Sequence, residues 1–324
     1  MGQLIKLQDY VSRYEQDIYR YPSQFVRLKR QQWAKMHAAF QEGALMEDER
    51  KAEDAEEFEE TPGLLDKVRG IFKRKAQAEE LAAKLKEEAE SAGDEGLHFK
   101  VPYIPNDEEE LKKLFLNQLF QFQMKWATST IREQSHVSRK FFVDEKLKFL
   151  LQRFPDTFLV LYRPVFQLKK APVETEIILL TPTATWCLGF MEDEDNAVYI
   201  GSTEKFWVKK HSKRADKKIL NPLLSLQRTE IIVKKIYLLS DVEIPVKQAL
   251  VTREGYIDFA GAPHNLMLLD KRGFPEWFRS MRNMPSPLKN QQLKGAEALL
   301  NYCQTSSIKR MEWNGADGLA GDLQ

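Results

Sequence analysis

The segment VETEIILLTPTATWCLGFM, residues 173–191, constrains the fold of this 324-residue chain more than any other stretch. Residues 176–181 are rich in β-branched and large apolar side chains, and Pro182 interrupts the run before a second apolar stretch at 183–191. This pattern predicts two strands joined by a tight turn at residues 181–183. Because the second strand is apolar on both faces, we expect it inside a sheet that is covered on both sides.

Several residues after this hairpin have a distinctive order. A short apolar strand at residues 197–200 leads to Trp207, which is followed by a basic stretch. A helix then begins at Asn221 and Pro222. Asn is a favourable N-cap, and Pro suits the first helical position because its missing N–H would be unpaired there. Gln227 lies further along the same helix.

In this order the residues resemble the nuclease-related domain (NERD), a bacterial branch of the PD-(D/E)XK nuclease superfamily. The family pattern has a helix with an acidic residue, a strand ending in Glu-Ile-Asp, a hairpin, a strand with Glu-any-Lys, a Trp, and Asn-Pro with a later Gln. The matching residues are Glu176, Ile177, Trp207, Asn221, Pro222 and Gln227. The resemblance covers residues 137–285 and implies a restriction-endonuclease-like fold, a mixed sheet flanked by helices.

The catalytic positions of the family pattern carry other residue types. Ile178 stands where the family has Asp, and Gly189 and Met191 stand where it has Glu and Lys. In the superfamily two carboxylates hold Mg²⁺, which activates water, and the lysine stabilises developing charge. Isoleucine and glycine offer no oxygen ligand, and methionine offers no charge. We therefore expect no intact catalytic set, no metal site and no other cofactor.

Nearby carboxylates keep a second hypothesis open, an active Mg²⁺-dependent nuclease with a migrated carboxylate site. Glu174 and Glu176 precede the hairpin and Glu192 follows it, and Glu176 shares a strand face with position 178. The possible remnants of the family site are Glu145, Glu176 and Gln227. Against this hypothesis, no lysine or arginine lies between positions 170 and 205.

A basic loop is expected at residues 205–218, where cations are interleaved with Phe206, Trp207 and His211. Its cations are Lys205, Lys209, Lys210, Lys213, Arg214, Lys217 and Lys218. Lysines neutralise phosphates and an aromatic ring can stack on a base, so this loop is the candidate surface for DNA or RNA. A solvated surface loop with Trp207 in the core is the alternative, because blocks of like charge are common on surfaces.

The N-terminal region, residues 1–135, is predicted to be helical, beginning with a helix at 3–20. A narrow apolar stripe at residues 63–92 predicts a long coiled-coil-like arm, for which a membrane-surface helix is the alternative. An acidic run at 42–60 is typical of a solvated segment. These helices are a possible surface for a protein partner, so a third hypothesis is an assembly or scaffold protein.

Composition narrows the class of protein further. The net charge of +1 is not that of a generic polyanion binder, and the two cysteines lie far apart in apolar surroundings, as in proteins of reducing compartments. No leader opens the sequence, and no apolar run approaches the ~18 residues that span a bilayer. The five histidines lack metal-ligand spacing. We therefore expect a cytoplasmic protein without a transmembrane segment.

Together these patterns predict an α/β protein in three parts. A helical region at 1–135 precedes an α/β domain at 136–310, and a flexible tail follows at 311–324. The first hypothesis for its function is a catalytically degenerate nuclease-fold protein that acts by binding nucleic acid or a protein partner.

Overall fold

The computed structural model of the chain describes residues 1–43, 103–168, 171–192 and 195–309. Contacts divide the chain into two compact units, Met1–Phe25 with Gln123–Gln324, and Val26–Phe122. The arm predicted at 63–92, the tail predicted at 311–324 and nearly all of the acidic run at 42–60 lie outside the described residues.

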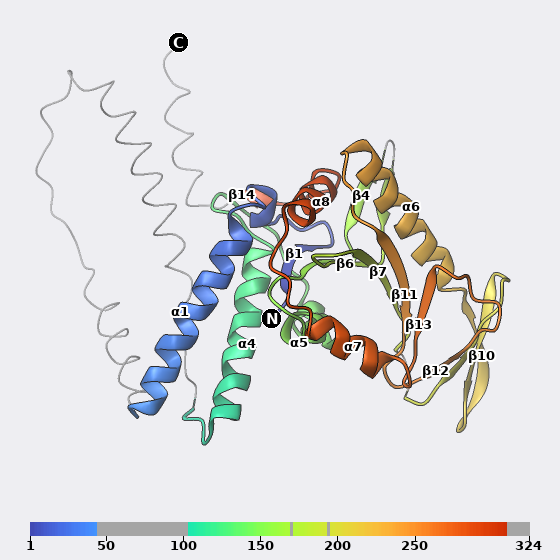
Figure 1. Ribbon diagram of the computed structural model, residues 1–324, viewed down its shortest axis with the longest axis horizontal. Helices are drawn as coiled ribbons and strands as arrows, with labels where there is room; N and C mark the ends of the chain where they lie inside the picture. The colour runs from blue at the N-terminus through green and yellow to red at the C-terminus, as the bar shows by residue number, and fades with distance from the viewer. Residues whose placement is uncertain (44–102, 169–170, 193–194, 310–324) are drawn as a thin grey trace, which may run out of the picture. The chain divides into compact units, whose positions relative to one another are not determined.

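The first unit is built around a six-stranded mixed sheet with strand order β1-β3-β6-β7-β11-β13 (Figure 1). Its strands are β1 (Gln3–Leu7), β3 (Leu159–Tyr162), β6 (Ile177–Leu180), β7 (Thr185–Phe190), β11 (Val246–Val251) and β13 (Leu266–Leu269). Strand β6 runs antiparallel to both of its neighbours, and every other neighbouring pair is parallel. The carboxyl ends of β1, β3, β7, β11 and β13 therefore meet at one edge of the sheet.

The hairpin predicted at residues 173–191 is confirmed as β6 and β7. Thr181 closes its turn, because its N–H and its hydroxyl both donate to the Ala184 carbonyl, at 2.9 and 2.8 Å. All four residues of β6 and the first five of β7 are buried. Both strands lie in the interior of the sheet, as their apolar character on both faces predicts.

Helices cover both faces of this sheet (Figure 1). They are α5 (Glu145–Arg153), α6 (Leu223–Leu239), α7 (Phe274–Arg282) and α8 (Asn290–Asn301). On one face the Thr185 and Tyr237 hydroxyls, of β7 and α6, lie 2.7 Å apart. The next residue, Trp186, points to the other face and packs edge-on against Trp277 of α7, with ring centroids 5.7 Å apart. The expected mixed sheet flanked by helices is confirmed.

A second sheet has the strand order β10-β9-β8-β12. Its strands are β8 (Val198–Ile200), β9 (Phe206–His211), β10 (Arg214–Leu220) and β12 (Tyr256–Asp258). The basic loop predicted at 205–218 is wrong, because this segment is the antiparallel hairpin of β9 and β10. Trp207 anchors it with a fully buried ring 5.2 Å from that of Phe259. Lysines occupy several solvent-facing positions of the hairpin, and some inward-facing ones too. The alternation of apolar and polar residues that marks a strand buried on one face is therefore not visible in the sequence.

The helix predicted at residues 3–20 is also wrong. This segment begins with the fully buried strand β1, followed by a 3₁₀ helix at Arg13–Glu15 that Ser12 caps. Residues 1–25 therefore belong to the unit that contains the sheet, and the predicted helical region at 1–135 is not one continuous part. A 3₁₀ turn at Arg139–Phe142 directly precedes α5.

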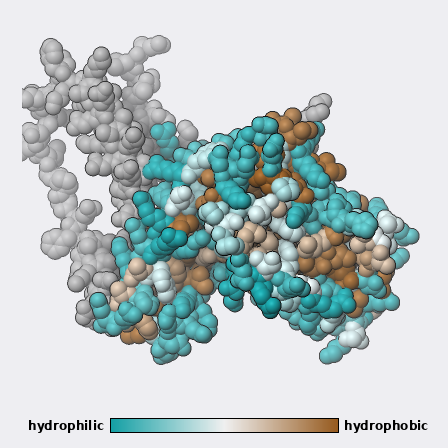
Figure 2. Space-filling view, in the orientation of Figure 1, coloured by the Kyte–Doolittle hydropathy of each residue, from teal (hydrophilic) through white to brown (hydrophobic). Residues whose placement is uncertain are grey.

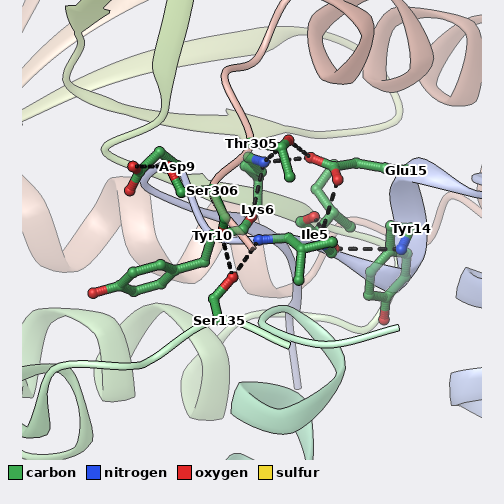
Figure 3. A network of polar contacts seen from close by, with 11 residues as sticks. Ile5, Lys6, Asp9, Tyr10, Tyr14, Glu15, Ser135, Thr305 and Ser306 are labelled. Carbon is green, nitrogen blue, oxygen red and sulfur yellow. Dashed lines mark hydrogen bonds and ion pairs between the residues drawn. The ribbon is translucent and has the colours of Figure 1, made fainter. Parts of the chain in front are cut away.

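A polar network joins strand β1 and the residues that follow it to Thr305 (Figure 3). The side chain of Lys6, in β1, is fully buried, and its ammonium donates to the Tyr10 carbonyl at 2.8 Å and to the Thr305 hydroxyl at 3.0 Å. It also forms an ion pair with Glu15, which accepts a hydrogen bond from Thr305 at 3.0 Å. All three ammonium protons thus have partners, which a buried lysine requires.

The remaining described elements are two helices and two small sheets. They are α1 (Tyr21–Gln41), α4 (Glu108–Trp126), the pair β2 (Glu133–Gln134) with β14 (Ile308–Lys309), and the hairpin of β4 (Val165–Leu168) with β5 (Ala171–Glu174). Within the second unit, Trp33 of α1 packs edge-on against Phe115 of α4, with ring centroids 5.1 Å apart. Helices α1 and α4 are the described helical part of the region predicted at 1–135.

Candidate functional site

The positions that correspond to the catalytic residues of the family lie on the sheet face that α6 covers, and they carry apolar side chains or none. Ile178 is fully buried and pairs across the sheet with Cys187, which shares its sheet face with Thr185 and Gly189. A Cβ added at Gly189 would lie 3.2 Å from Leu250 Cδ1 and 3.9 Å from Leu226 Cδ1, so no space is free there. Met191 is 7% exposed. These positions provide neither oxygen ligands nor room for a hydrated Mg²⁺ and a phosphate.

The possible remnants of the family site are not brought together. Glu145 begins α5, on the face opposite to α6, and Gln227 is exposed on α6. Glu176 precedes β6, and its backbone N–H donates to the Thr229 hydroxyl at 3.0 Å. Glu174, an alternative carboxylate, pairs with Arg163 at 2.9 Å and is half exposed. These carboxylates are spread over both faces of the sheet.

A buried carboxylate on the α6 face, Glu230, is already neutralised. Its Oε2 accepts a hydrogen bond from Gln248 at 2.8 Å, and its Oε1 lies 2.8 Å from the Lys234 ammonium. Gln248 stands opposite Cys187 in the β7–β11 register. Burial, followed by the charge of Glu230, raises the pKa of the Cys187 thiol, which keeps it protonated and inert as a nucleophile.

The described residues contain a pocket of about 540 Å³ at the edge where the parallel strands β7 and β11 end. It is lined by Asp144, Glu145, Lys146, Glu192, Asp195, His211, Arg214, Thr252, Arg253 and Glu254. Ligands of α/β sheets commonly bind outside the carboxyl ends of the strands. The lining includes α5 and the turn of the β9–β10 hairpin, so the pocket is polar on several sides.

The pocket holds a firm ion pair that sequence reasoning missed. Arg253 donates to both carboxylate oxygens of Glu192, at 2.5 and 2.8 Å, and its guanidinium lies 4.5 Å from the ring centroid of Phe149. Glu192 follows β7 and Arg253 follows β11, and the register pairs Phe190 with Val251. Glu192 and Arg253 each lie two residues beyond this pair of residues. Opposite charges at equal distances beyond the ends of two strands are therefore the sequence signal that could have predicted this contact. A carboxylate held in this way is not free to bind a metal.

Asp144 holds the other side of the pocket. One carboxylate oxygen caps α5 by accepting from the N–H groups of Lys146 and Leu147, at 2.9 and 3.1 Å. The other accepts from the Tyr162 hydroxyl at 2.6 Å. Burial, and then this hydrogen bond, raise the pKa of the Tyr162 phenol well above its ordinary value. Both carboxylate oxygens of Asp144 are thus occupied by hydrogen bonds that position α5 against β3.

We expect Asp144→Ala to destabilise the protein by about 2–3 kcal/mol, because it removes a helix cap and leaves the Tyr162 hydroxyl without its acceptor. Asp144→Asn should cost less, since Asn caps helices well. Urea denaturation measures both changes. Glu145→Ala is the matched control, because Glu145 is exposed and should cost under about 0.5 kcal/mol. Equal losses at positions 144 and 145 would contradict this role.

The predicted nucleic-acid residues divide between the two faces of the β9–β10 hairpin. Lys209 is 6% exposed on the inner face beside Trp207, with Lys217 opposite it, and Arg214 lines the pocket. The outer face of the hairpin consists of Phe206, Val208, Lys210, Asp216, Lys218 and Leu220. Lys205 precedes β9 and Lys213 lies in the turn, and both are exposed.

Carboxylates outnumber cations in the pocket, and this decides which hairpin face suits a polyanion. Five carboxylates line it beside three lysine or arginine side chains, so the inner face meets a net negative surface. On the outer face Phe206 is 49% exposed, and the cation Lys205 lies 5.7 Å from its ring centroid. The formal charge of the pocket lining is therefore negative, and the cations Lys205, Lys210 and Lys218 lie outside it.

Two further classes of site are absent from the part of the chain that the structure describes. It contains no group of three or more His, Cys, Asp or Glu side chains placed to hold a metal ion. No described helix combines the length and the apolar character needed to cross a membrane.

Comparison with known proteins gives one short similarity. The chain is 54% identical over 41 residues to a protein of Geobacillus stearothermophilus described as RNA 2',3'-cyclic phosphodiesterase. The match spans 13% of this chain and 13% of the length of that relative. No family model matches the chain. No solved structure matches it either.

Proposed function

We propose that this chain is a catalytically degenerate, nuclease-related protein that binds nucleic acid through the outer face of the β9–β10 hairpin. The observation that carries the proposal is the exposed cationic and aromatic surface of this hairpin. The second hypothesis, a migrated metal site, finds less support because Glu192 is held by Arg253.

The order of elements supports the nuclease-like part of the proposal. A helix (α5), the strands β6 and β7 joined by a turn, Trp207 and a helix after Asn221 occur in the order of the NERD pattern. Glu176 and Ile177 stand at the start of β6, whereas the pattern has Glu-Ile-Asp at the end of its strand. Two framework residues, Trp207 and Asn221, have structural roles. The Asn221 side chain donates to the Glu204 carbonyl at 2.8 Å and accepts from the Leu223 N–H at 3.0 Å, which fixes the start of α6.

The loss of catalysis follows from the surroundings of Ile178, Gly189 and Met191. Two-carboxylate chemistry needs oxygen ligands around an octahedral Mg²⁺ that keeps several waters. A side chain at position 189 would meet Leu250 of β11 at 3.2 Å and Leu226 of α6 at 3.9 Å, and Ile178 is fully buried. We therefore propose that binding, without cleavage of the phosphodiester, is the activity.

The hairpin supplies the elements that sequence-independent binding requires. Lys210 and Lys218 point to the same side, and Phe206 offers a ring face for stacking. Asp216 lies 3.9 Å from Lys210, but both side chains are more than half exposed, so this pair is weak and a phosphate can replace it. A two-stranded ribbon can also enter the major groove of a duplex.

A charge reversal tests the proposal. We expect Lys210→Glu/Lys218→Glu to weaken binding of a 20-nucleotide single-stranded DNA or RNA at least tenfold at low salt. The magnitude of the slope of log K against log salt concentration should fall by about 2, as expected for the loss of two phosphate contacts. Phe206→Ala should weaken single-strand binding by about 1–3 kcal/mol. Fluorescence anisotropy over a salt series measures all three effects.

The matched control is Lys113→Glu/Lys125→Glu, which makes the same change of charge at exposed positions of α4. An equal loss in this control would show that overall charge, and not the hairpin, governs binding. Absence of binding by the parent protein at low salt would refute the proposal. Mg²⁺-dependent nicking that Glu192→Gln abolishes would favour the migrated-site hypothesis instead.

A further inference from the structure

Helix α6 is apolar on both sides, and its second apolar side is exposed. Its inner side packs on the sheet through buried residues such as Leu226, Val233 and Ile236. Of the twelve large apolar side chains that are exposed among the described residues, four lie on this helix. They are Leu224 (47% exposed), Ile231 (64%), Leu238 (82%) and Leu239 (62%). Figure 2 shows hydrophobic surface in the region of α6.

The spacing of these residues indicates what kind of surface they form. Leu224, Ile231 and Leu238 are seven residues apart, close to two helical turns, so they form a narrow stripe about 21 Å long. An apolar residue in every heptad supplies one of the two core positions on which a second helix packs, and Arg228 and Lys235 occupy the other. Apolar patches of this extent on a soluble protein usually mark an interaction site.

Within α6, the exposed charged side chains beside the stripe are all cations. Asp241, one turn beyond Leu238, pairs with Lys294 at 3.3 Å. Arg228 and Lys235 lie between its apolar residues, and Lys234 flanks its other side. The single carboxylate of α6, on Glu230, is 11% exposed and occupied by Gln248 and Lys234. In a helix pair the residues that flank the seam select partners of opposite charge. The complementary partner therefore carries carboxylates beside its apolar seam.

We propose that the outer face of α6, defined by Leu224, Arg228, Ile231, Lys235 and Leu238, docks an acidic amphipathic helix of a partner protein. A second copy of this chain fits poorly, because an antiparallel pair centred on Ile231 would place Lys234 opposite Arg228 of the other copy. A membrane surface also fits poorly, since the stripe is narrower than the wide apolar face of an interfacial helix.

The proposal is tested with two synthetic helical peptides on the full-length protein. Both carry leucines at heptad a and d positions, and one has glutamates and the other lysines at e and g. We expect the glutamate peptide to bind, and Ile231→Glu to weaken it at least tenfold, as truncating a central anchor does. Lys235→Glu should reduce the preference for the glutamate peptide. Isothermal titration calorimetry measures the affinities.

Val143→Glu is the matched control, because Val143 is a β-branched residue that is 71% exposed on another element. It should leave peptide binding unchanged. Failure of the glutamate peptide to bind, or equal binding of both peptides, overturns the proposal. So does a dimer in sedimentation velocity, or binding to vesicles of anionic phospholipid, that Ile231→Glu abolishes.

The two proposals concern separate surfaces and can fail independently. Ile231→Glu leaves the outer face of the hairpin intact, and should therefore retain nucleic-acid binding. Lys210→Glu/Lys218→Glu should likewise retain peptide binding, within about twofold.

Discussion

Introducing aspartate at position 178 is expected to destabilise the protein by at least about 4 kcal/mol, because it buries a carboxylate that has no partner. Ile178 is fully buried in β6, between Leu161 of β3 and Cys187 of β7. Neither neighbour offers a cation or a strong donor. The substitution that would restore the first catalytic residue type of the family is therefore among the most damaging in the sheet.

Urea denaturation followed by circular dichroism measures this loss, and Ile178→Val is its control at about 1 kcal/mol. The loss should depend on pH. Burial raises the pKa of the new carboxyl in the folded state, so ionisation at higher pH opposes folding. The penalty should be full above the folded pKa and should shrink as the pH falls towards the unfolded value of about 4.

A triple variant tests whether the volume between α6 and the sheet is filled by side chains or has room for a metal ion. Ile178→Asp, Gly189→Glu and Met191→Lys together restore the residue types of the family. If this variant keeps the parent's stability within about 1 kcal/mol and binds Mg²⁺ at millimolar concentration, the volume under α6 can hold a metal, and the packing argument is wrong. We expect instead that it unfolds and gives no metal-binding heat.

The β6–β7 hairpin was predictable because local pattern and tertiary environment agree there. An apolar run interrupted at Pro182 has no alternative to a buried strand pair. Strand β1 was not predictable in the same way, because Lys6 breaks its apolar run. Tyr10 and Glu15, two of the partners of Lys6, are close in sequence, but the third, Thr305, lies 299 residues away, and an isolated lysine in an apolar run does not show that it is buried.

The β9–β10 hairpin was missed for a related reason. Five of the seven residues of β10 in a row are exposed, so the strand has no alternating pattern. Its place in the sheet depends on Trp207 in β9, whose anchoring role becomes visible only with Phe259 opposite. Sequence therefore identified the cations but not the face on which each lies.

The pocket could not be derived from sequence because it depends on strand order. Glu192 and Arg253 are 61 residues apart and meet because β7 and β11 are parallel neighbours. The sequence identifies the residues that follow each strand. Neither strand's own sequence shows that β7 and β11 are neighbours in the sheet. The outer face of α6 was overlooked because a helix that is apolar nearly all round is usually buried.

Breaking the Lys6–Glu15 pair is the second large effect that we expect. Glu15→Gln leaves a fully buried ammonium with only neutral partners, and should destabilise the protein by about 3 kcal/mol. Lys6→Met should cost less, about 2 kcal/mol, because the Glu15 carboxylate is 19% exposed and still accepts from Thr305. The Lys6→Met/Glu15→Gln double variant should lose less than the sum of the two.

Urea denaturation of the four proteins gives the coupling energy of the pair, which we expect at about 1–3 kcal/mol. The exposed pair of Lys294 and Asp241, at 3.3 Å, is the matched comparison, and its coupling should stay below about 0.5 kcal/mol. Because Thr305 joins the same network, this coupling also measures how firmly the end of the described chain holds strand β1. Additive single losses would show that Lys6 and Glu15 are stabilised separately and that the network does not act as a unit.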